Sequence, residues 1–292
     1  MKILITGAGG QLGKNLSGIS QLSYDVFALD RQALDITDFQ SVEKVLSEIH
    51  PDCVINAAAY TAVDKAEIEP EPAFNVNRDG PANLAKVCSL LDIPLIHVST
   101  DYVFSGNKSS PYVETDEVKS INVYGESKWL GEEAVRDNCQ KHIILRVSWV
   151  FGFYGNNFVK TIQRLARERE ELRIVNDQVG APTSTENISK VLLHIVEKIR
   201  MPGFYGYGTY HYCDGPATNW FEFAEAIVNE TKQYEDLFVK TITPITTKEF
   251  PTPAKRQKNS RMDCSKLKTQ FGIEQYFWQT ALKKMVKDLQ DS

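Results

Sequence analysis

The sequence has no long apolar run, no strong excess of one charge and no paired cysteine motif. Its five cysteines are scattered without a Cys-x-x-Cys spacing, which argues against both a disulfide framework and a zinc site. The net charge of −5 and the lack of a basic run argue against nucleic-acid and membrane-surface partners. No stretch approaches the roughly 20 apolar residues of a membrane span, and the N-terminal apolar run is too short for a signal peptide. We therefore expect a soluble cytoplasmic protein.

The first half of the chain alternates short apolar runs with helix-like segments. The apolar runs are brief and bounded by turn or polar residues, which is typical of buried strands. They cover residues 2–6, 25–29, 53–56, 95–99 and 143–147. Helices are predicted over residues 11–19, 39–49, 73–91 and 123–137, with Asp38 as an N-cap signal for the second of them. This alternation predicts an α/β fold with a doubly wound parallel sheet, the Rossmann fold.

The pattern loosens after about residue 150. Helices are predicted over 157–169, 186–199 and 220–230, a strand over 172–175, and loops over 176–183 and 247–261. We expect an NAD(P)-binding Rossmann domain over residues 1–169 and a smaller C-terminal α/β substrate-binding domain over residues 170–292. Parts of residues 184–235 are expected to fold back onto the first domain.

A glycine-rich turn lies between the first predicted strand and the first predicted helix. Gly7, Gly10 and Gly13 are spaced three residues apart, unlike the Gly-x-Gly-x-x-Gly of many dehydrogenases. Glycine lets the backbone turn tightly and approach a pyrophosphate, whose charge then lies at the positive N-terminus of the helix. The turn therefore predicts a dinucleotide site.

Two residues at the end of the second predicted strand argue in opposite directions about the cofactor. Asp30 suits the ribose hydroxyls of NAD(H), whereas the adjacent Arg31 suits the 2′-phosphate of NADP(H). The choice between the two cofactors therefore stays open. Asp35 and Ile36 either lie against the adenine or serve as a turn acid and a core aliphatic.

Small and hydroxylated residues follow two further strands. The run at 56–61, Asn-Ala-Ala-Ala-Tyr-Thr, would let a cofactor lie against the backbone, although alanines also simply pack in cores. Thr100 follows the strand at 95–99 and is a candidate to polarise a substrate carbonyl. Asp101 and Tyr102 are candidates to shape the substrate pocket, and Asp101 could equally cap a turn.

Tyr124 and Lys128 are four residues apart on a predicted helix, so they share one face. A nearby cation favours phenolate and lowers the pKa of the phenol, which suits a proton donor. Beside a dinucleotide, this pair is typical of a carbonyl reductase.

With these segments placed, the chain closely resembles the dTDP-4-dehydrorhamnose reductase family, within the extended short-chain dehydrogenase/reductases. The glycines and the Tyr-x-x-x-Lys pair mark only the superfamily. The more specific blocks are Val-Asp-Lys-Ala-Glu at 63–67, Asp-Gln-Val-Gly-Ala-Pro-Thr at 177–183 and Asn-Ser-Arg at 259–261. Further shared blocks are 10–13, 56–59, 99–104, 122–128, 148–150 and 156–158.

The resemblance implies NAD(P)H-dependent reduction of the C4 ketone of dTDP-4-dehydro-L-rhamnose, in dTDP-rhamnose biosynthesis for cell-surface polysaccharide. It implies that Tyr124 is the proton donor, that Lys128 tunes it and binds the nicotinamide ribose, and that Thr100 polarises the ketone. The implied cofactor contacts are Gly10, Gln11, Leu12, Asp30, Asp35, Ile36, Ala59, Tyr60 and Thr61. The implied substrate contacts are Thr100, Asp101 and Trp149, with Tyr102 and Asn157 as further candidates.

Other features of the resemblance are less definite. Arg256 and Arg261 are candidates to bind the diphosphate, or they belong to a solvated basic loop. Some family members use a glutamate in the first helix to hold a divalent metal between two subunits, and Asn15 stands at that position here. We assign no metal ligand, and a magnesium ion and the choice between monomer and homodimer stay open.

Two other functions are compatible with parts of the pattern. One is a non-catalytic NADP-binding regulatory subunit, such as the related β subunit of methionine adenosyltransferase, which would not need Thr100, Tyr124 and Lys128. The other is a nucleotide-sugar epimerase or dehydratase. A dehydratase usually has an Asp-Glu pair after the threonine, whereas Thr100 is followed by Asp-Tyr.

Overall fold

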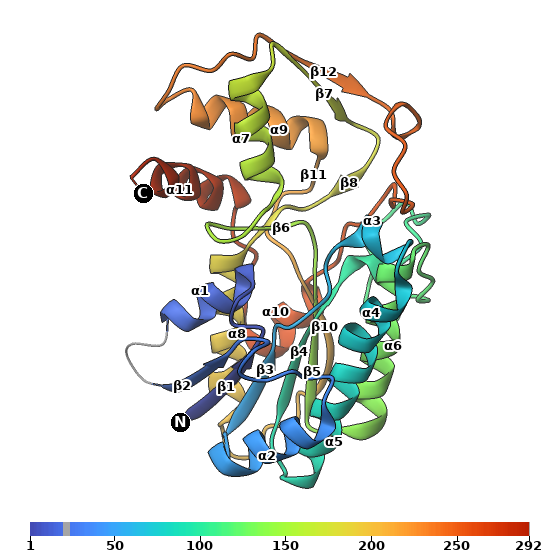
Figure 1. Ribbon diagram of the computed structural model, residues 1–292, viewed down its shortest axis with the longest axis vertical. Helices are drawn as coiled ribbons and strands as arrows, with labels where there is room; N and C mark the ends of the chain where they lie inside the picture. Colours follow the sequence, from blue (N-terminus) through green and yellow to red (C-terminus); the bar gives the residue numbers. More distant parts are fainter. Residues whose placement is uncertain (20–23, 292) are drawn as a thin grey trace.

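The computed structural model describes residues 1–19 and 24–291 and contains a six-stranded parallel sheet at its centre (Figure 1). The strand order is β10-β5-β4-β3-β1-β2. The bounds are β1 Lys2–Thr6, β2 Asp25–Leu29, β3 Cys53–Asn56, β4 Leu95–Thr100, β5 His142–Val147 and β10 Gly208–Tyr212. The doubly wound parallel sheet predicted from the alternation is confirmed, and β10 adds a strand from the second half of the chain.

Both faces of this sheet are covered, which explains why its strands are apolar throughout. Side chains alternate between the faces, because successive residues of a strand point in opposite directions. Ile3 and Ile5 of β1 join one buried cluster, and Leu4 between them joins another. The first cluster is completed by α1 Gln11–Ile19, α8 Thr185–Ile199 and α10 Ser265–Phe271. The second is completed by α2 Phe39–Ile49, α5 Gly80–Leu90 and α6 Val123–Asn138.

The helix predicted over residues 73–91 is interrupted, so that prediction is wrong in one respect. The segment consists of α4 Pro70–Phe74, a π-helical turn η1 Asn75–Asp79, and α5. Pro81 has no N–H to donate to a carbonyl in the preceding turn, and this favours a local change of helical type. The other predicted helices agree with the structure to within a few residues, and the Asp38 side chain accepts from the Gln40 N–H at the start of α2.

A second region lies beyond the sheet's carboxyl edge, at the top of Figure 1. There β7 Glu171–Val175 pairs in parallel with β12 Thr241–Ile245. Around them lie α7 Phe158–Glu168, α9 Trp220–Thr231 and α11 Trp278–Gln290, which share a third buried cluster. Neither β12 nor α11 was predicted from the sequence.

Short strands connect the two regions. The pairs are β6 Val150–Phe151 with β9 Thr183–Ser184, and β8 Val179–Gly180 with β11 Thr218–Asn219. The prediction of a loop over 176–183 is therefore wrong, because β8 and the start of β9 lie in it. Residues 250–264 are irregular, as predicted, after a 3₁₀ turn η3 Thr247–Glu249. None of the helices within the described ranges is long and apolar enough to cross a membrane.

Candidate active site

The carboxyl ends of the central strands open onto a cavity of about 600 Å³. Thr100, Tyr124 and Lys128 all line it, together with Gln11 and Leu12 at the start of α1. The strand end, the helix and the glycine turn that were identified separately in the sequence therefore meet at one place.

Thr100 is positioned by the turn that ends β4. It is the N-cap of the 3₁₀ turn η2 Asp101–Val103, where the Tyr102 N–H donates to its Oγ1 at 3.2 Å. The hydroxyl itself donates to Asp101 Oδ1 at 3.0 Å. Both contacts fix the orientation of this side chain at the cavity wall.

Tyr124 is brought close to Thr100 by the tight packing of α6 against η2. Gly125 makes this approach possible, because a Cβ there would lie 2.1 Å from the Tyr102 carbonyl oxygen. The helix begins at an N-cap, Asn122, whose side chain accepts from the Gly125 N–H at 2.8 Å. The Tyr124 and Tyr102 rings then meet edge to face, 5.4 Å apart.

The electrostatics of the pair differ from the prediction. Burial raises the pKa of the Tyr124 phenol, and a hydrogen bond with Thr100 opposes this only in part. The Lys128 Nζ donates to the Val98 carbonyl at 2.7 Å and lies 3.3 Å from His97 Nε2. Burial lowers the pKa of Lys128 to about 8. The expectation that Lys128 lowers the pKa of the phenol is therefore wrong for this structure, where desolvation dominates.

Asp101 carries an unsatisfied buried oxygen in the same cavity. Its side chain is 1% exposed, and Oδ2 has no hydrogen-bond partner within residues 1–19 and 24–291, although the nearby Ser260 hydroxyl partly offsets the effect of burial on the pKa of the carboxyl. Burial raises the pKa of this carboxyl to about 7. Since buried polar atoms are normally paired, Oδ2 is suited to bind a hydroxyl group of a ligand.

The glycine turn brings the backbone close to the strand end at 57–58. Gly7 has a φ of +72°, and a Cβ on it would lie 2.6 Å from Ala58. Gly13 lets α1 pack on the turn, because a Cβ there would lie 2.2 Å from the Gly7 oxygen. A further cavity of about 290 Å³ adjoins the first, sharing Gly9, Gly10, Ala57 and Ala59 with it.

The two residues that argued in opposite directions about the cofactor have different surroundings. Asp30 Oδ1 accepts from the backbone N–H groups of Gln32 and Ala33, both at 3.0 Å, and Asp30 lines neither of these cavities. Arg31 lines the smaller cavity, with its guanidinium 3.5 Å from Asp35 and its side chain 81% exposed.

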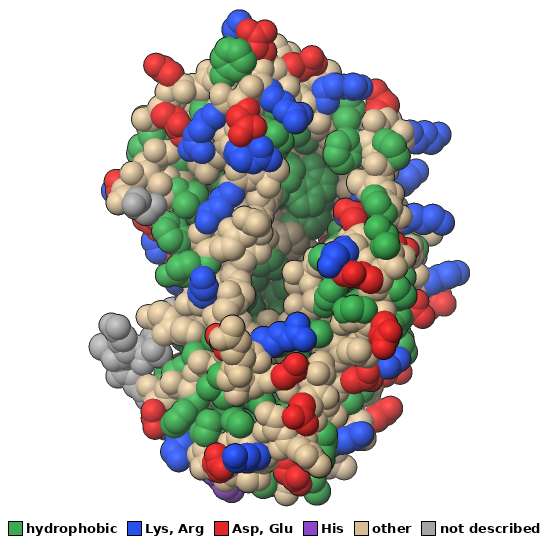
Figure 2. All heavy atoms as spheres, in the orientation of Figure 1, with side chains coloured by type: hydrophobic (Ala, Val, Ile, Leu, Met, Phe, Trp, Pro, Cys, Tyr) green, Lys and Arg blue, Asp and Glu red, His purple; other side chains and the backbone are tan. Residues whose placement is uncertain are grey.

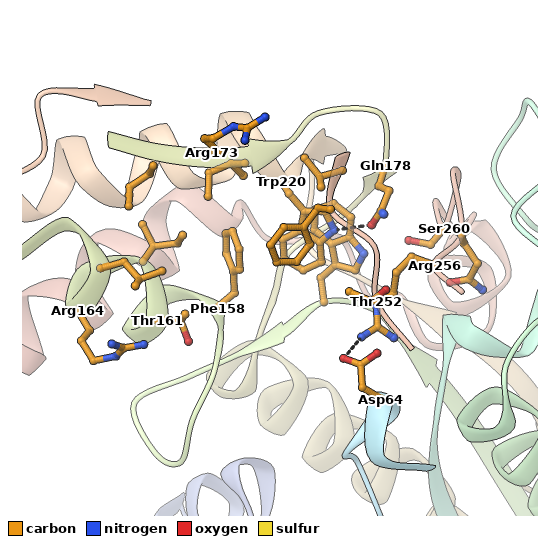
Figure 3. Close-up of a pocket in the computed structure, with 18 of the residues that line it drawn as sticks. Asp64, Phe158, Thr161, Arg164, Arg173, Gln178, Trp220, Thr252, Arg256 and Ser260 are labelled. Atoms are coloured by element: carbon orange, nitrogen blue, oxygen red, sulfur yellow. Dashed lines mark hydrogen bonds and ion pairs between the residues drawn. The ribbon is translucent and has the colours of Figure 1, made fainter. Parts of the chain in front are cut away.

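A second large cavity, of about 620 Å³, lies between the sheet and the outer region (Figure 3). Figure 2 shows the hollow on this face of the molecule. Aromatic and cationic side chains dominate its wall, among them Phe158, Arg164, Arg173 and Arg256. Three side chains line both this cavity and the one at Tyr124: Tyr102, Trp149 and Trp220.

Trp149 and Trp220 are stacked where the two large cavities meet. Their ring centroids are 3.6 Å apart and their planes differ by 8°. Trp149 has a positive φ of 44°, which is unusual for a bulky residue. Gly180 makes room for it, since a Cβ there would lie 2.4 Å from the ring. The Trp220 indole N–H donates to Gln178 at 3.2 Å, so the 177–183 block positions both rings.

Arg256 enters the second cavity from the irregular segment. Its Nη2 donates to Asp64 Oδ2 at 2.7 Å, while its buried Nη1 has no partner among the residues that the structure describes. Arg261 has a different environment: its guanidinium donates to Asn259 Oδ1 at 2.8 Å and to the Ser109 carbonyl. The structure does not bring Arg261 to either large cavity.

Comparisons with known proteins agree with this geometry. A family model described as "RmlD substrate binding domain" matches residues 1–291. The chain is 46% identical over 285 residues to a dTDP-4-dehydrorhamnose reductase of Aggregatibacter actinomycetemcomitans, covering 97% of each protein. It is 38% identical over 296 residues to the Escherichia coli K12 enzyme of that name, covering 99% of this chain and 98% of the relative. The chain belongs to the dTDP-4-dehydrorhamnose reductase family.

Solved structures of the family have the same fold. The Clostridium acetobutylicum dTDP-4-dehydrorhamnose reductase superposes with a TM-score of 0.92 at 40% identity, covering 99% of this chain and 100% of that one. The Bacillus anthracis dTDP-4-dehydrorhamnose reductase, solved in complex with NADP, gives a TM-score of 0.90 at 37% identity, covering 98% and 99%.

Most of the site residues predicted from the sequence, by their pattern or by the resemblance, line one of the three cavities. They are Gly7, Gly10, Gln11, Leu12, Arg31, Asp35, Ile36, Ala59, Tyr60, Thr61, Thr100, Asp101, Tyr102, Tyr124, Lys128, Trp149 and Arg256. Gly13, Asp30, Asn157 and Arg261 line none of them. Asn157 instead caps α7 and donates to Gln11 Oε1 at 3.0 Å, so it supports a cavity residue from behind.

Asn15, the position at which the resemblance raised the question of a metal ligand, is part of a neutral contact. The Thr185 hydroxyl donates to Asn15 Oδ1 at 2.8 Å. Within residues 1–19 and 24–291, no group of three or more His, Cys, Asp or Glu side chains is arranged to hold a metal ion.

Sequence reasoning missed Trp220, Gln178 and Asp64 as cavity residues. Gln178 and Asp64 lie inside the specific blocks at 177–183 and 63–67, so the blocks themselves were a usable signal. Trp220 had none, because a tryptophan at the start of a helix is equally compatible with core packing.

Proposed function

We propose that this chain is an NADPH-dependent reductase that converts dTDP-4-dehydro-L-rhamnose to dTDP-L-rhamnose. One observation carries the proposal: Thr100, Tyr124 and Lys128 line the same cavity as the glycine turn, and that cavity meets a second one large enough for a nucleotide. Membership in the family, whose relatives bear this activity in their names, supports it.

The residues around the glycine turn fit a dinucleotide. At Gly7 and Gly13 the backbone lies so close to Ala58 and to the Gly7 carbonyl, respectively, that no side chain would fit at either position. The first N–H groups of α1, at Gln11 and Leu12, have no acceptor within the helix and suit a pyrophosphate. Arg31 at the smaller cavity suits a 2′-phosphate, whereas Asp30 is engaged by backbone amides, so we assign NADPH over NADH. The bound cofactor supplies the hydride.

The chain's own residues supply the proton. The raised pKa keeps Tyr124 in its phenol form until negative charge develops on the ketone oxygen, and the phenol then donates its proton to that oxygen. On substrate binding the Thr100 hydroxyl turns its hydrogen from Asp101 Oδ1 to the same ketone oxygen and stabilises the developing charge. Lys128, a buried cation on the same helix face, stabilises the phenolate that remains.

The second cavity holds the rest of the sugar nucleotide. Asp101 Oδ2 accepts from a sugar hydroxyl, and the unpartnered Nη1 of Arg256 donates to the diphosphate. Phe158 and Trp220 provide apolar surface for the base. We assign cofactor binding to the 1–169 domain, with α8, β10 and α10 folded back onto it, and sugar-nucleotide binding mainly to residues 170–292, which α7 of the first domain joins in one buried cluster.

The test is NADPH consumption with dTDP-4-dehydro-L-rhamnose, compared with NADH and with a UDP-linked 4-ketosugar. We expect turnover with the dTDP substrate and NADPH, and dTDP-L-rhamnose as the product. No consumption with any ketosugar would instead favour a regulatory NADP-binding protein. A cofactor that co-purifies and is not released each cycle would favour an epimerase.

A further inference from the structure

A series of buried polar side chains connects β1 to the Lys128 amine. The Thr6 hydroxyl donates to Asn56 Oδ1 at 2.7 Å, Asn56 Nδ2 lies 2.9 Å from His97 Nδ1, and His97 Nε2 lies 3.3 Å from Lys128 Nζ. The first three side chains are 0% exposed and Lys128 is 1% exposed. Thr6, Asn56 and His97 line neither large cavity, so the proposed chemistry leaves this series unexplained.

The backbone fixes the orientation of the Asn56 amide. The Ala58 N–H, which can only donate, lies 3.1 Å from Asn56 Oδ1. The amide oxygen must therefore face Ala58, and the NH₂ group must face His97. It follows that His97 Nδ1 accepts a hydrogen bond. Burial holds the pKa of His97 well below its usual range, so the ring is neutral and its one proton is on Nε2.

The Nε2–H group faces a side chain that prefers to donate. An ammonium has three donors and no acceptor, so it cannot receive a hydrogen bond from His97. A neutral amine has a lone pair that accepts from Nε2–H, and it still donates to the Val98 carbonyl at 2.7 Å. The arrangement therefore makes the Lys128 ammonium a stronger acid, although Lys128 is still a cation at neutral pH because its pKa falls only to about 8.

Other charged and titratable groups near Lys128 do not remove this bias. Tyr124 and Glu132 lie on the same helix, and Glu132 alone favours the ammonium. Its carboxylate is already engaged by the buried Arg146 of β5 at 2.7 Å and by Arg136 at 2.6 Å. Most of its charge is therefore balanced by the two guanidinium groups.

We propose that Asn56 and His97 are positioning residues that promote proton loss from Lys128 by holding an N–H donor against its nitrogen. This rests on the proposed function. After Tyr124 has given its proton to the ketone oxygen, an N–H bond of the Lys128 ammonium breaks and the proton passes to the phenolate oxygen. The phenol is restored, the lone pair left on Lys128 accepts from His97 Nε2–H, and solvent later returns a proton to the amine.

The direct test is NMR of the protein labelled with ¹⁵N-histidine and ¹³Cε-lysine, with Lys128→Arg identifying the Lys128 signal. In the unmodified protein we expect His97 as the Nε2–H tautomer. In His97→Gln, whose amide oxygen can accept from the ammonium, the Lys128 titration should move up by about one pH unit or more. His142→Gln is the matched control, since His142 lies on β5 with Nδ1 2.6 Å from the Cys139 carbonyl and should leave the titration unchanged.

A double-mutant cycle separates the tautomer from simple charge. Asn56→Asp accepts from Nδ1–H, so it should switch His97 to the opposite tautomer and raise the pKa of Lys128. In a His97→Leu background, Asn56→Asp adds only a negative charge, because no imidazole is left to change tautomer. The rise that it causes in the pKa of Lys128 should therefore be smaller there than in the protein that retains His97. Equal shifts would show that the tautomer has no effect.

The proposal is overturned if His97 is the Nδ1–H tautomer, a result that needs no variant. It is also overturned if His97→Gln folds and binds NADPH normally yet leaves the Lys128 titration unchanged. Neither measurement requires turnover. If the protein shows the expected Lys128 titration but reduces no ketosugar, the proposed function is wrong and the inference about Asn56 and His97 still holds. In an active enzyme, the alkaline limb of the kcat profile should move with the Lys128 titration.

Discussion

The cavity at Tyr124 and the cavity at Arg256 are built in different ways. Most of the wall of the first comes from the ends of successive strands and the turns after them, at residues 9–12, 57–63, 98–102 and 147–150, and Tyr124 and Lys128 of α6 and Trp220 of α9 complete it. The wall of the second combines segments from Asp64 to Ser260 that are remote in sequence. The first is therefore determined by the parallel sheet itself, because the carboxyl ends of its strands meet at one edge. The second depends on how the outer region packs.

The two cavities also differ in what they contribute chemically. The first places groups with perturbed pKa values, Asp101, Tyr124 and Lys128, in a desolvated site. The second presents aromatic rings and guanidinium groups, which suit binding more than proton transfer. Substitutions in the first should therefore change turnover, and substitutions in the second should change the KM for the sugar nucleotide.

The largest effect is expected for Tyr124→Phe. Loss of the proton donor should lower kcat by about 10²- to 10⁴-fold, while the Kd for NADPH stays within about twofold. Steady-state NADPH consumption and a fluorescence titration of the cofactor measure the two. Unchanged turnover would show that Tyr124 is not the proton donor. The cavity at Tyr124 would then no longer differ from the cavity at Arg256 in supplying a proton.

Asp101→Asn should change how stability depends on pH. The folded-state pKa of Asp101 is raised, so as pH rises from about 4 to 7 the unfolded state loses its proton first and the folded state becomes less stable. The asparagine cannot ionise. The free energy of unfolding of the variant, relative to the unmodified protein, should therefore increase by on the order of 2 kcal/mol between pH 5 and pH 8.

Urea unfolding at the two pH values provides the measurement. A difference between the two proteins that is the same at pH 5 and pH 8 would show that Asp101 is ionised in the folded state throughout. The first cavity would then be less desolvated than its burial indicates.

Arg256→Gln tests the second cavity. The loss of a charged donor to the diphosphate should raise the KM for the sugar nucleotide by about 10- to 30-fold, with the Kd for NADPH unchanged. Arg261→Gln is the matched control, because Arg261 lies on the same segment but contacts Asn259 and Ser109. Equal effects from the two variants would mean that the segment acts only through its general charge.

The smallest effect is expected for Arg31→Ala, at the cavity beside the glycine turn. The preference for NADPH over NADH, as a ratio of kcat/KM values, should fall by about fivefold. The effect is limited because the side chain is 81% exposed and solvent screens its charge. An unchanged ratio would show that Arg31 does not select the cofactor.

The same contrast explains what could be predicted from the sequence. Strands and helices around the first cavity have strong local patterns, and the order of strands and turns then brings Thr100, Tyr124 and Lys128 together. The pairing of β7 with β12 and the stacking of Trp149 on Trp220 depend on contacts between remote segments, which no local pattern encodes. The error about the pKa of Tyr124 has a related cause, since spacing places a cation on the same helix face but does not measure desolvation.

The Arg256 and Arg261 pair illustrates the limit most directly. Both are arginines on one irregular segment, five residues apart, and no local sequence pattern distinguishes their roles. Only the fold distinguishes them, because Asp64 of the remote 63–67 block pairs with Arg256, whereas the nearby Asn259 pairs with Arg261.

The sixth strand and the cluster beneath it affect the order in which the protein can fold during synthesis. β10 pairs with β5, and the cluster on that face of the sheet includes Leu267 and Phe271 of α10. When only the first 169 residues have emerged from the ribosome, one edge of the sheet is unpaired and one of its faces is covered only by α1. The nascent sheet therefore exposes apolar surface until residue 271 has emerged, and during that interval it is a natural target for chaperones.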